Sequence, residues 1–79
     1  MHQAVQDILR YFDFEHLPPE LQAVSAPFRK LAQEMACHLE GPELTAGLRK
    51  LLEAKDCFVR AAITPTFRDK VHANFTGGN

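Results

Sequence analysis

The chain has 79 residues, of which 46% are apolar and 24% are charged. This length fits one small domain and excludes two-domain enzyme architectures. Nine Lys and Arg against ten Asp and Glu give a formal net charge of −1, which leaves no basic surplus for contacts with many nucleic-acid phosphates. The composition therefore disfavours DNA or RNA binding, and a helix-turn-helix DNA reader is the weakest alternative.

The sequence shows no sign of membrane insertion or secretion. Its apolar stretches are far shorter than the roughly 20 residues that cross a bilayer, and the N-terminus lacks a basic segment followed by an apolar block. The two cysteines, Cys37 and Cys57, lie in amphipathic stretches without the spacing of a disulfide scaffold. We therefore expect free thiols, no membrane partner and a cytoplasmic location.

The first predicted element is a short helix over residues 1–11. Its apolar positions recur at spacings of three and four, and they are Val5, Ile8, Leu9 and Phe12. Because a helix of about ten residues is marginal alone, it must pack against another element. Pro18 and Pro19 disfavour its continuation, and Pro19 is a favourable first residue for the next helix.

The second predicted helix begins at Pro19 and has the clearest apolar pattern of the chain. The pattern alternates gaps of three and four residues through Leu21, Val24, Phe28, Leu31, Met35 and Leu39. Pro27 lies inside this pattern and removes a backbone donor to Ala23. The sequence leaves two alternatives open, a kink at Pro27 or a restarted helix with Ser25 as its N-cap.

Residues 41–42, Gly-Pro, predict a tight turn into a third helix that runs antiparallel to the second. Its apolar side comprises Leu44, Leu48, Leu51, Leu52, Phe58 and Ala62. The helix is expected to end near Ile63, before the Thr-Pro pair that follows. Lys55, Asp56 and Arg60 form a charged cluster that is typical of a solvated helix surface.

The predicted fold class is all-α. A short N-terminal helix and an antiparallel two-helix hairpin form one domain over residues 1–63, and residues 64–79 form a C-terminal tail. Phe67, Val71 and Phe75 are spaced by four, which would allow one or two helical turns in the tail. Because two long helices and one short helix enclose little core, we expect assembly into a homo-oligomer. A monomeric three-helix bundle is the alternative.

The sequence gives little support for a metal site or a catalytic site. Cys37 and His38 are adjacent, so on a helix they diverge by about 100° and are poorly placed to bind one ion. The candidate nucleophiles Ser25, Cys37 and Cys57 have no base at a suitable spacing and no glycine-rich oxyanion loop. We therefore expect no metal, no cofactor and no enzymatic activity.

The loop before the second helix and the first turns of that helix carry the candidate ligand-binding residues. A nucleobase can stack on an aromatic ring while a phosphate accepts hydrogen bonds from a guanidinium. Phe14 and Arg29 are the main candidates, and His16 and Lys30 are weaker ones. The competing interpretation is that Phe12 and Phe14 only fix the loop to the core.

Several blocks of this sequence resemble a known family. They read FDFEHLPPELQ at residues 12–22, PFRKLA at 27–32, LRKLLEAKD at 48–56 and VRAA at 59–62. These blocks are similar to those of the anti-CBASS cyclic-nucleotide sponges of bacteriophages, which are small phage proteins with a two-helix hairpin. The resemblance covers residues 12–63, about two-thirds of the chain.

The resemblance implies an all-helical homo-oligomer, a homohexamer in the best-known members, that sequesters cyclic dinucleotides of the 3′,3′-cGAMP type without cleaving them. Such a protein acts in the cytoplasm of the infected bacterium, where it keeps the immune signal from CBASS effectors. In the family, a loop aromatic stacks on the base and a basic residue fifteen positions later contacts phosphate, which corresponds here to Phe14 and Arg29. The family more commonly has Tyr and Lys at these positions.

The alternative function is a small helical interaction protein. In that interpretation the apolar loop and the hairpin face dock on a host or phage protein. Phe12, Phe14 and Phe28 would then act as hydrophobic anchors.

Overall fold

The computed structural model describes residues 2–63, and within that range the chain is helical and contains no strand. The elements are α1 at Gln3–Leu9, a 3-10 turn η1 at Arg10–Phe12, α2 at Pro19–His38 and α3 at Pro42–Ile63. The predicted all-α class is thereby confirmed. Within residues 2–63, no helix combines the length and the apolar character that a membrane span requires. The helical turns predicted around Phe67, Val71 and Phe75 fall outside the described residues.

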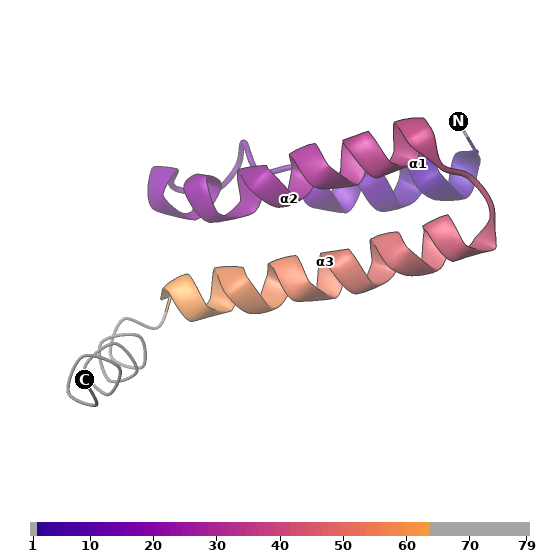
Figure 1. The fold of residues 1–79 in the computed structure, drawn as a ribbon. Coiled ribbons are helices and arrows are strands. Elements are labelled where there is room, and N and C mark those ends of the chain that lie inside the picture. The colour runs from indigo at the N-terminus through magenta and orange to yellow at the C-terminus, as the bar shows by residue number, and fades with distance from the viewer. Residues whose placement is uncertain (1, 64–79) are drawn as a thin grey trace, which may run out of the picture.

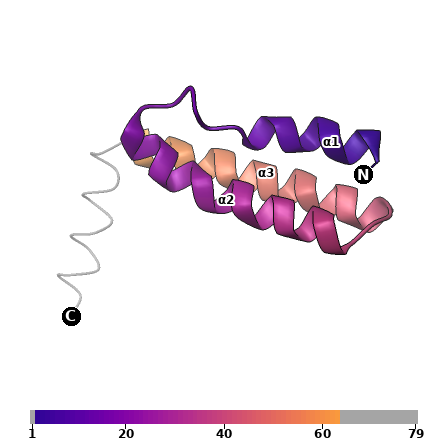
Figure 2. The ribbon, with the colours of Figure 1, turned by 90° about the horizontal axis from the view of Figure 1, so that it is seen from above.

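The two long helices lie side by side, and α1 lies along them (Figures 1 and 2). Residues 39–41 connect α2 to α3, and the chain reverses direction there (Figure 1). Gly41 adopts a φ of +99°, a left-handed conformation that a residue without a side chain accepts at little cost. The segment that connects η1 to α2 runs along the first part of α2 to the beginning of that helix, where the chain turns back (Figure 2).

A small apolar core lies between α1, η1 and the two long helices. Its buried members are Val5, Ile8, Phe12, Ala32, Ala36, Leu44 and Leu48. Phe12 is fully buried, which confirms the predicted apolar side of the first helix. Because α1 has only seven residues, burial of this side against α2 and α3 stabilises it more than its own helix propensity does.

The helix α2 continues through Pro27 without interruption, so the helix does not restart at Ser25. Ser25 and Ala32 are fully buried, whereas Leu31 and Leu39 are 43% and 54% exposed. The predicted line of large apolar residues is therefore only partly buried within the described chain. Small side chains occupy the centre of the contact because they let the neighbouring elements approach α2 closely.

The prediction of a solvated charged cluster on the third helix is wrong for Lys55, which is only 9% exposed. Its Nζ donates a hydrogen bond to the backbone oxygen of Tyr11 at 3.0 Å and pairs with the carboxylate of Asp56 at 2.9 Å. The alkyl part of a lysine can pack on apolar surface while its ammonium reaches a polar group. Lys55 thus ties α3 to the 3-10 turn that precedes the candidate site.

An apolar surface on α2 and α3 is partly exposed within the described chain. Phe28, Leu31 and Met35 are spaced by three and four residues, so they share one side of α2. The ring of Phe28 stacks on the ring of Phe58 from α3, with the ring centroids 5.5 Å apart. Leu31 is 43% exposed and Phe58 is 56% exposed. These four residues are called the outer apolar face below.

Candidate ligand-binding site

Phe14 and Arg29 lie together in the structure. Phe14 belongs to the segment between η1 and α2, and Arg29 belongs to α2. The central carbon of the guanidinium, Cζ, lies over the ring at 5.4 Å from its centroid. A cation at this distance is attracted by the electron-rich face of the ring. The two main candidates from the sequence therefore form one local site.

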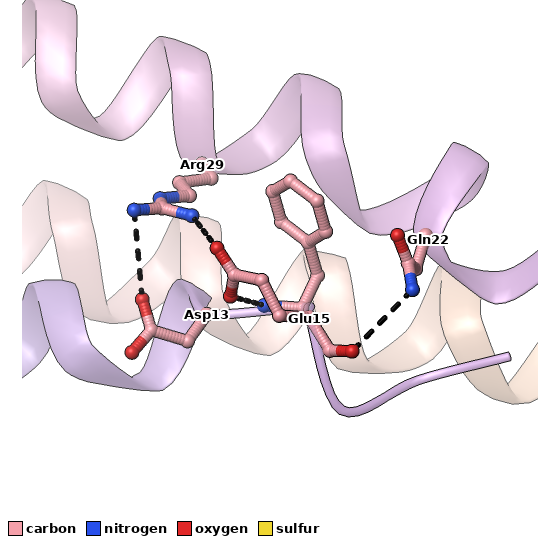
Figure 3. Close-up of polar contacts among 5 residues, drawn as sticks. Asp13, Glu15, Gln22 and Arg29 are labelled. Atoms are coloured by element: carbon pink, nitrogen blue, oxygen red, sulfur yellow. Dashed lines mark hydrogen bonds and ion pairs between the residues drawn. The ribbon is translucent and has the colours of Figure 1, made fainter. Parts of the chain in front are cut away.

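Gln22 holds the segment that carries Phe14 against the start of α2. Its Nε2 donates to the backbone oxygen of Leu17 at 2.7 Å. It also lies 3.4 Å from the backbone oxygen of Glu15, to which it donates (Figure 3). The backbone N–H of Leu17 also donates to the oxygen of Phe14 at 3.0 Å, which closes a turn. These contacts use backbone oxygens, so the path of the segment does not depend on the Phe14 ring alone.

Two carboxylates converge on the guanidinium of Arg29 (Figure 3). Oε1 of Glu15 accepts a hydrogen bond from one terminal nitrogen, and Oδ1 of Asp13 lies 3.9 Å from the other. The second carboxylate oxygen of Glu15 accepts a hydrogen bond from the backbone N–H of Phe14 at 3.2 Å. Arg29 therefore faces two negative charges within the described part of the chain.

The pKa of Glu15 is lowered from its ordinary value of 4.5. The main cause is a hydrogen bond from its own backbone N–H, followed by the hydrogen bond from Arg29, and these outweigh a small effect of desolvation. Glu15 is therefore ionised at neutral pH, and its contact with Arg29 is an ion pair. Because the pair is exposed to water, its contribution to stability is small.

The other two predicted ligand-binding residues do not join this site. His16 follows Glu15 in the turn and is exposed. Lys30 is exposed on α2, and because successive helical residues diverge by about 100°, its side chain leaves the helix in a different direction from Arg29. The structure thus groups Phe14 with Arg29 and leaves His16 and Lys30 apart.

The sequence interpretation missed Asp13 and Glu15. They contact Arg29 from 16 and 14 positions away, and no periodic spacing indicates such a pairing. Their position on both sides of the aromatic candidate, Phe14, was the one available signal.

A separate groove lies where the start of α1 meets the connection between α2 and α3, with a volume of about 830 Å³. Its lining residues are His2, Ala4, Val5, Ala36, Cys37, Leu39, Glu40, Gly41, Pro42, Leu44 and Thr45. None of them is Lys or Arg, so this lining offers no guanidinium or ammonium to a phosphate. The lining of this groove therefore lacks the guanidinium that Arg29 offers beside Phe14.

Metal ligands do not gather within residues 2–63, where no group of three or more His, Cys, Asp or Glu side chains could hold an ion. Cys37 and Cys57 are exposed free thiols, as the sequence predicts.

Comparisons of the chain with models of protein families, with characterised proteins and with solved structures found no match. A functional assignment therefore depends on the chemistry of the site and on the sequence blocks described above.

Proposed function

We propose that this protein is a non-enzymatic phage sponge that sequesters cyclic dinucleotides of the 3′,3′-cGAMP type and so blocks the activation of CBASS effectors in the infected bacterium. The observation that carries the proposal is the position of the Arg29 guanidinium 5.4 Å from the centroid of the Phe14 ring. The ring is a stacking surface for a base, and the guanidinium is a charge-assisted donor to a phosphate.

The exposure of the two side chains supports a ligand-binding role. Phe14 is half-buried, and the side chain of Arg29 is 30% exposed. Each group therefore keeps a surface that a ligand can contact, while its remaining surface rests on the protein. Partial burial also limits the side-chain entropy that binding must remove.

The symmetry of the ligand favours a site shared by two copies of the chain. A cyclic dinucleotide has two bases and two phosphates related by an approximate two-fold axis, and a two-fold interface presents Phe14 and Arg29 twice. Each stacked base contributes about 1–3 kcal/mol and each charge-assisted hydrogen bond about 1.5–3 kcal/mol. Two sets of contacts together are comparable with the association cost of about 4–15 kcal/mol, whereas one set falls in the lower part of that range.

The outer apolar face supports the assembly that such a shared site requires. Leu31 and Phe58 are 43% and 56% exposed within residues 2–63, and a second copy would remove them from water. We propose that the antiparallel hairpin of α2 and α3 is the assembling unit, and that the assembly is a homohexamer as in the family that the sequence resembles.

Isothermal titration calorimetry with 3′,3′-cGAMP tests the proposal. The wild-type protein should bind, and Phe14→Ala and Arg29→Ala should each weaken binding at least about tenfold. Matched controls are Tyr11→Ala, an aromatic residue that is 66% exposed, and Arg49→Ala, an exposed arginine on α3.

Recovery of the ligand separates sequestration from catalysis. After heat denaturation of the complex, chromatography should return the cyclic dinucleotide intact. If the wild-type protein binds neither 3′,3′-cGAMP, cyclic di-GMP nor cyclic di-AMP at micromolar concentration, the proposal is wrong.

The second candidate function is a protein-interaction module, and the exposure of Tyr11, Phe58 and Ile63 at 66%, 56% and 57% favours it. One of the anchors predicted for this function has to be withdrawn, because Phe12 is fully buried in the core. A pull-down that recovers a stoichiometric protein partner, with cyclic dinucleotides inert, would support this function over the first.

A further inference from the structure

The carboxylate of Glu15 occupies the hydrogen-bond donors that a ligand phosphate needs. One of its oxygens accepts from the Arg29 guanidinium, and the other accepts from the backbone N–H of Phe14 at 3.2 Å. Two oxygens of a phosphate group engage a guanidinium and a backbone N–H in the same manner. An anion that belongs to the chain itself therefore engages both donors.

We propose that Glu15 is a specificity-determining residue, a tethered competitor that keeps single phosphate groups away from Arg29. The identity of the ligand that overcomes this competition, a cyclic dinucleotide, rests on the proposed function. The Glu15 carboxylate is tethered beside Arg29, so it competes for the guanidinium at an effective concentration in the millimolar range. A free mononucleotide competes with it through one phosphate and one base. A cyclic dinucleotide bound between two copies displaces two Glu15 carboxylates, but its two phosphates and two bases belong to one molecule, so the cost of association is met once.

Exposure allows the competitor to be displaced. The side chain of Glu15 is 65% exposed, so the carboxylate can leave Arg29 for water without a large desolvation cost. An exposed ion pair of this kind changes an equilibrium by up to about fivefold. A ligand that binds once is weakened by this factor. A cyclic dinucleotide meets two such pairs, which weaken it up to about 25-fold, less than the roughly 10²–10⁴-fold that linking two binding groups adds.

A substitution of Glu15 should leave the path of the segment before α2 unchanged. Gln22 bonds the backbone oxygens of Leu17 and Glu15 and does not use the Glu15 carboxylate, so the segment keeps these anchors when the side chain is changed. Asp13 lies 3.9 Å from Arg29 and therefore supplies background negative charge but no close hydrogen bond.

The test is an NMR titration with 5′-AMP as the probe, because it carries one base and one phosphate. Glu15→Ala and Glu15→Gln should bind 5′-AMP at least about threefold more tightly than the wild-type protein. Glu20→Gln makes the same change of net charge at an exposed position in the first turn of α2 and should leave binding unchanged. Adding Arg29→Ala to Glu15→Ala should abolish the gain.

The outcomes distinguish this inference from the proposed function. If neither Glu15 variant gains affinity for 5′-AMP, or if Glu20→Gln gives the same gain, Glu15 is not a competitor, whether or not 3′,3′-cGAMP binds. If the wild-type protein binds no cyclic dinucleotide and Glu15→Ala still gains Arg29-dependent binding of 5′-AMP, the competitor role stands and the proposed function fails. Circular dichroism of each variant confirms that a change in binding is not a loss of fold.

Discussion

The guanidinium of Arg29 lies over the ring of Phe14, 5.4 Å from its centroid, although the two residues are fifteen positions apart in the sequence. The contact exists because the segment after η1 passes beside α2 before that helix begins. Neither residue belongs to the buried core. Changes at this pair should therefore alter ligand binding more than they alter the free energy of unfolding.

Phe14→Leu tests whether the aromatic face matters. Leucine keeps an apolar side chain but has no flat π surface, so the affinity for 3′,3′-cGAMP should fall at least about tenfold. Phe14→Tyr keeps the ring and should bind as the wild-type protein does. Calorimetry measures both, and a Phe14→Leu variant with wild-type affinity would show that the ring does not stack on a base.

Leu31→Glu tests the outer apolar face. A charge at this side chain, which is 43% exposed, should weaken self-association without unfolding the chain, because burial of an unpaired charge in an interface is costly. Gln33→Glu adds the same charge at an exposed polar position of α2 and is the matched control. Light scattering coupled to size-exclusion chromatography measures the mass of the assembly for each variant. Equal masses for the wild type and Leu31→Glu would place any assembly elsewhere.

Ser25→Ala should stabilise the protein by about 1 kcal/mol. The Ser25 hydroxyl is fully buried and has no hydrogen-bond partner among the described residues, so its removal relieves an unmet desolvation cost. Alanine also has the higher helix propensity. Urea unfolding measures the change, and a loss of stability would indicate that this hydroxyl has a partner in the assembled protein.

Lys55→Met should lower the free energy of unfolding by about 1–2 kcal/mol. Methionine keeps most of the apolar contact of the side chain but removes the donor to the Tyr11 backbone oxygen, 3.0 Å away, and the pair with Asp56. Lys50→Met, at an exposed position of the same helix, should change stability by less than about 0.5 kcal/mol. Similar effects of both substitutions would contradict a structural role for Lys55.

The hydrogen bonds that the Glu15 carboxylate accepts from its own backbone N–H and from Arg29 make stability depend on pH in acid. The folded-state pKa of Glu15 lies below its ordinary value of 4.5, so its stabilising contribution is present above that pH and is lost as the pH falls through the folded-state pKa. The stability difference between the wild type and Glu15→Gln in urea unfolding should therefore shrink as the pH falls below 4.5. A difference that stays constant as the pH falls would contradict the preference of these hydrogen bonds for the ionised carboxylate.

Much of the fold could be predicted because it depends on preferences of neighbouring residues along the chain. The predicted end of the third helix near Ile63 coincides with the last described residue and stays a prediction. Pro19 and Pro42 begin the two long helices, as the preference of proline for the first helical turn predicts. These boundaries depend on a few neighbouring residues, which is why a single sequence contains them.

Contacts between distant elements account for what the sequence did not predict. The burial of Ser25 and Lys55 depends on how closely α1 and η1 approach the long helices, and periodicity carries no such information. At the site, Phe14 and Arg29 were predicted from the chemistry of base stacking and phosphate binding together with the family resemblance. The engagement of Arg29 by Glu15 depends on the path of an irregular segment, which no spacing rule specifies.

Native mass spectrometry of the wild-type protein with 3′,3′-cGAMP tests the central claim most directly, because it reads the mass of the assembly and of the ligand in one spectrum. The account predicts a homo-oligomer that carries intact cyclic dinucleotide, and Phe14→Ala and Arg29→Ala variants that assemble but carry none. An assembled wild-type protein that remains empty with every cyclic dinucleotide, or ligand retained in both variants, would contradict it.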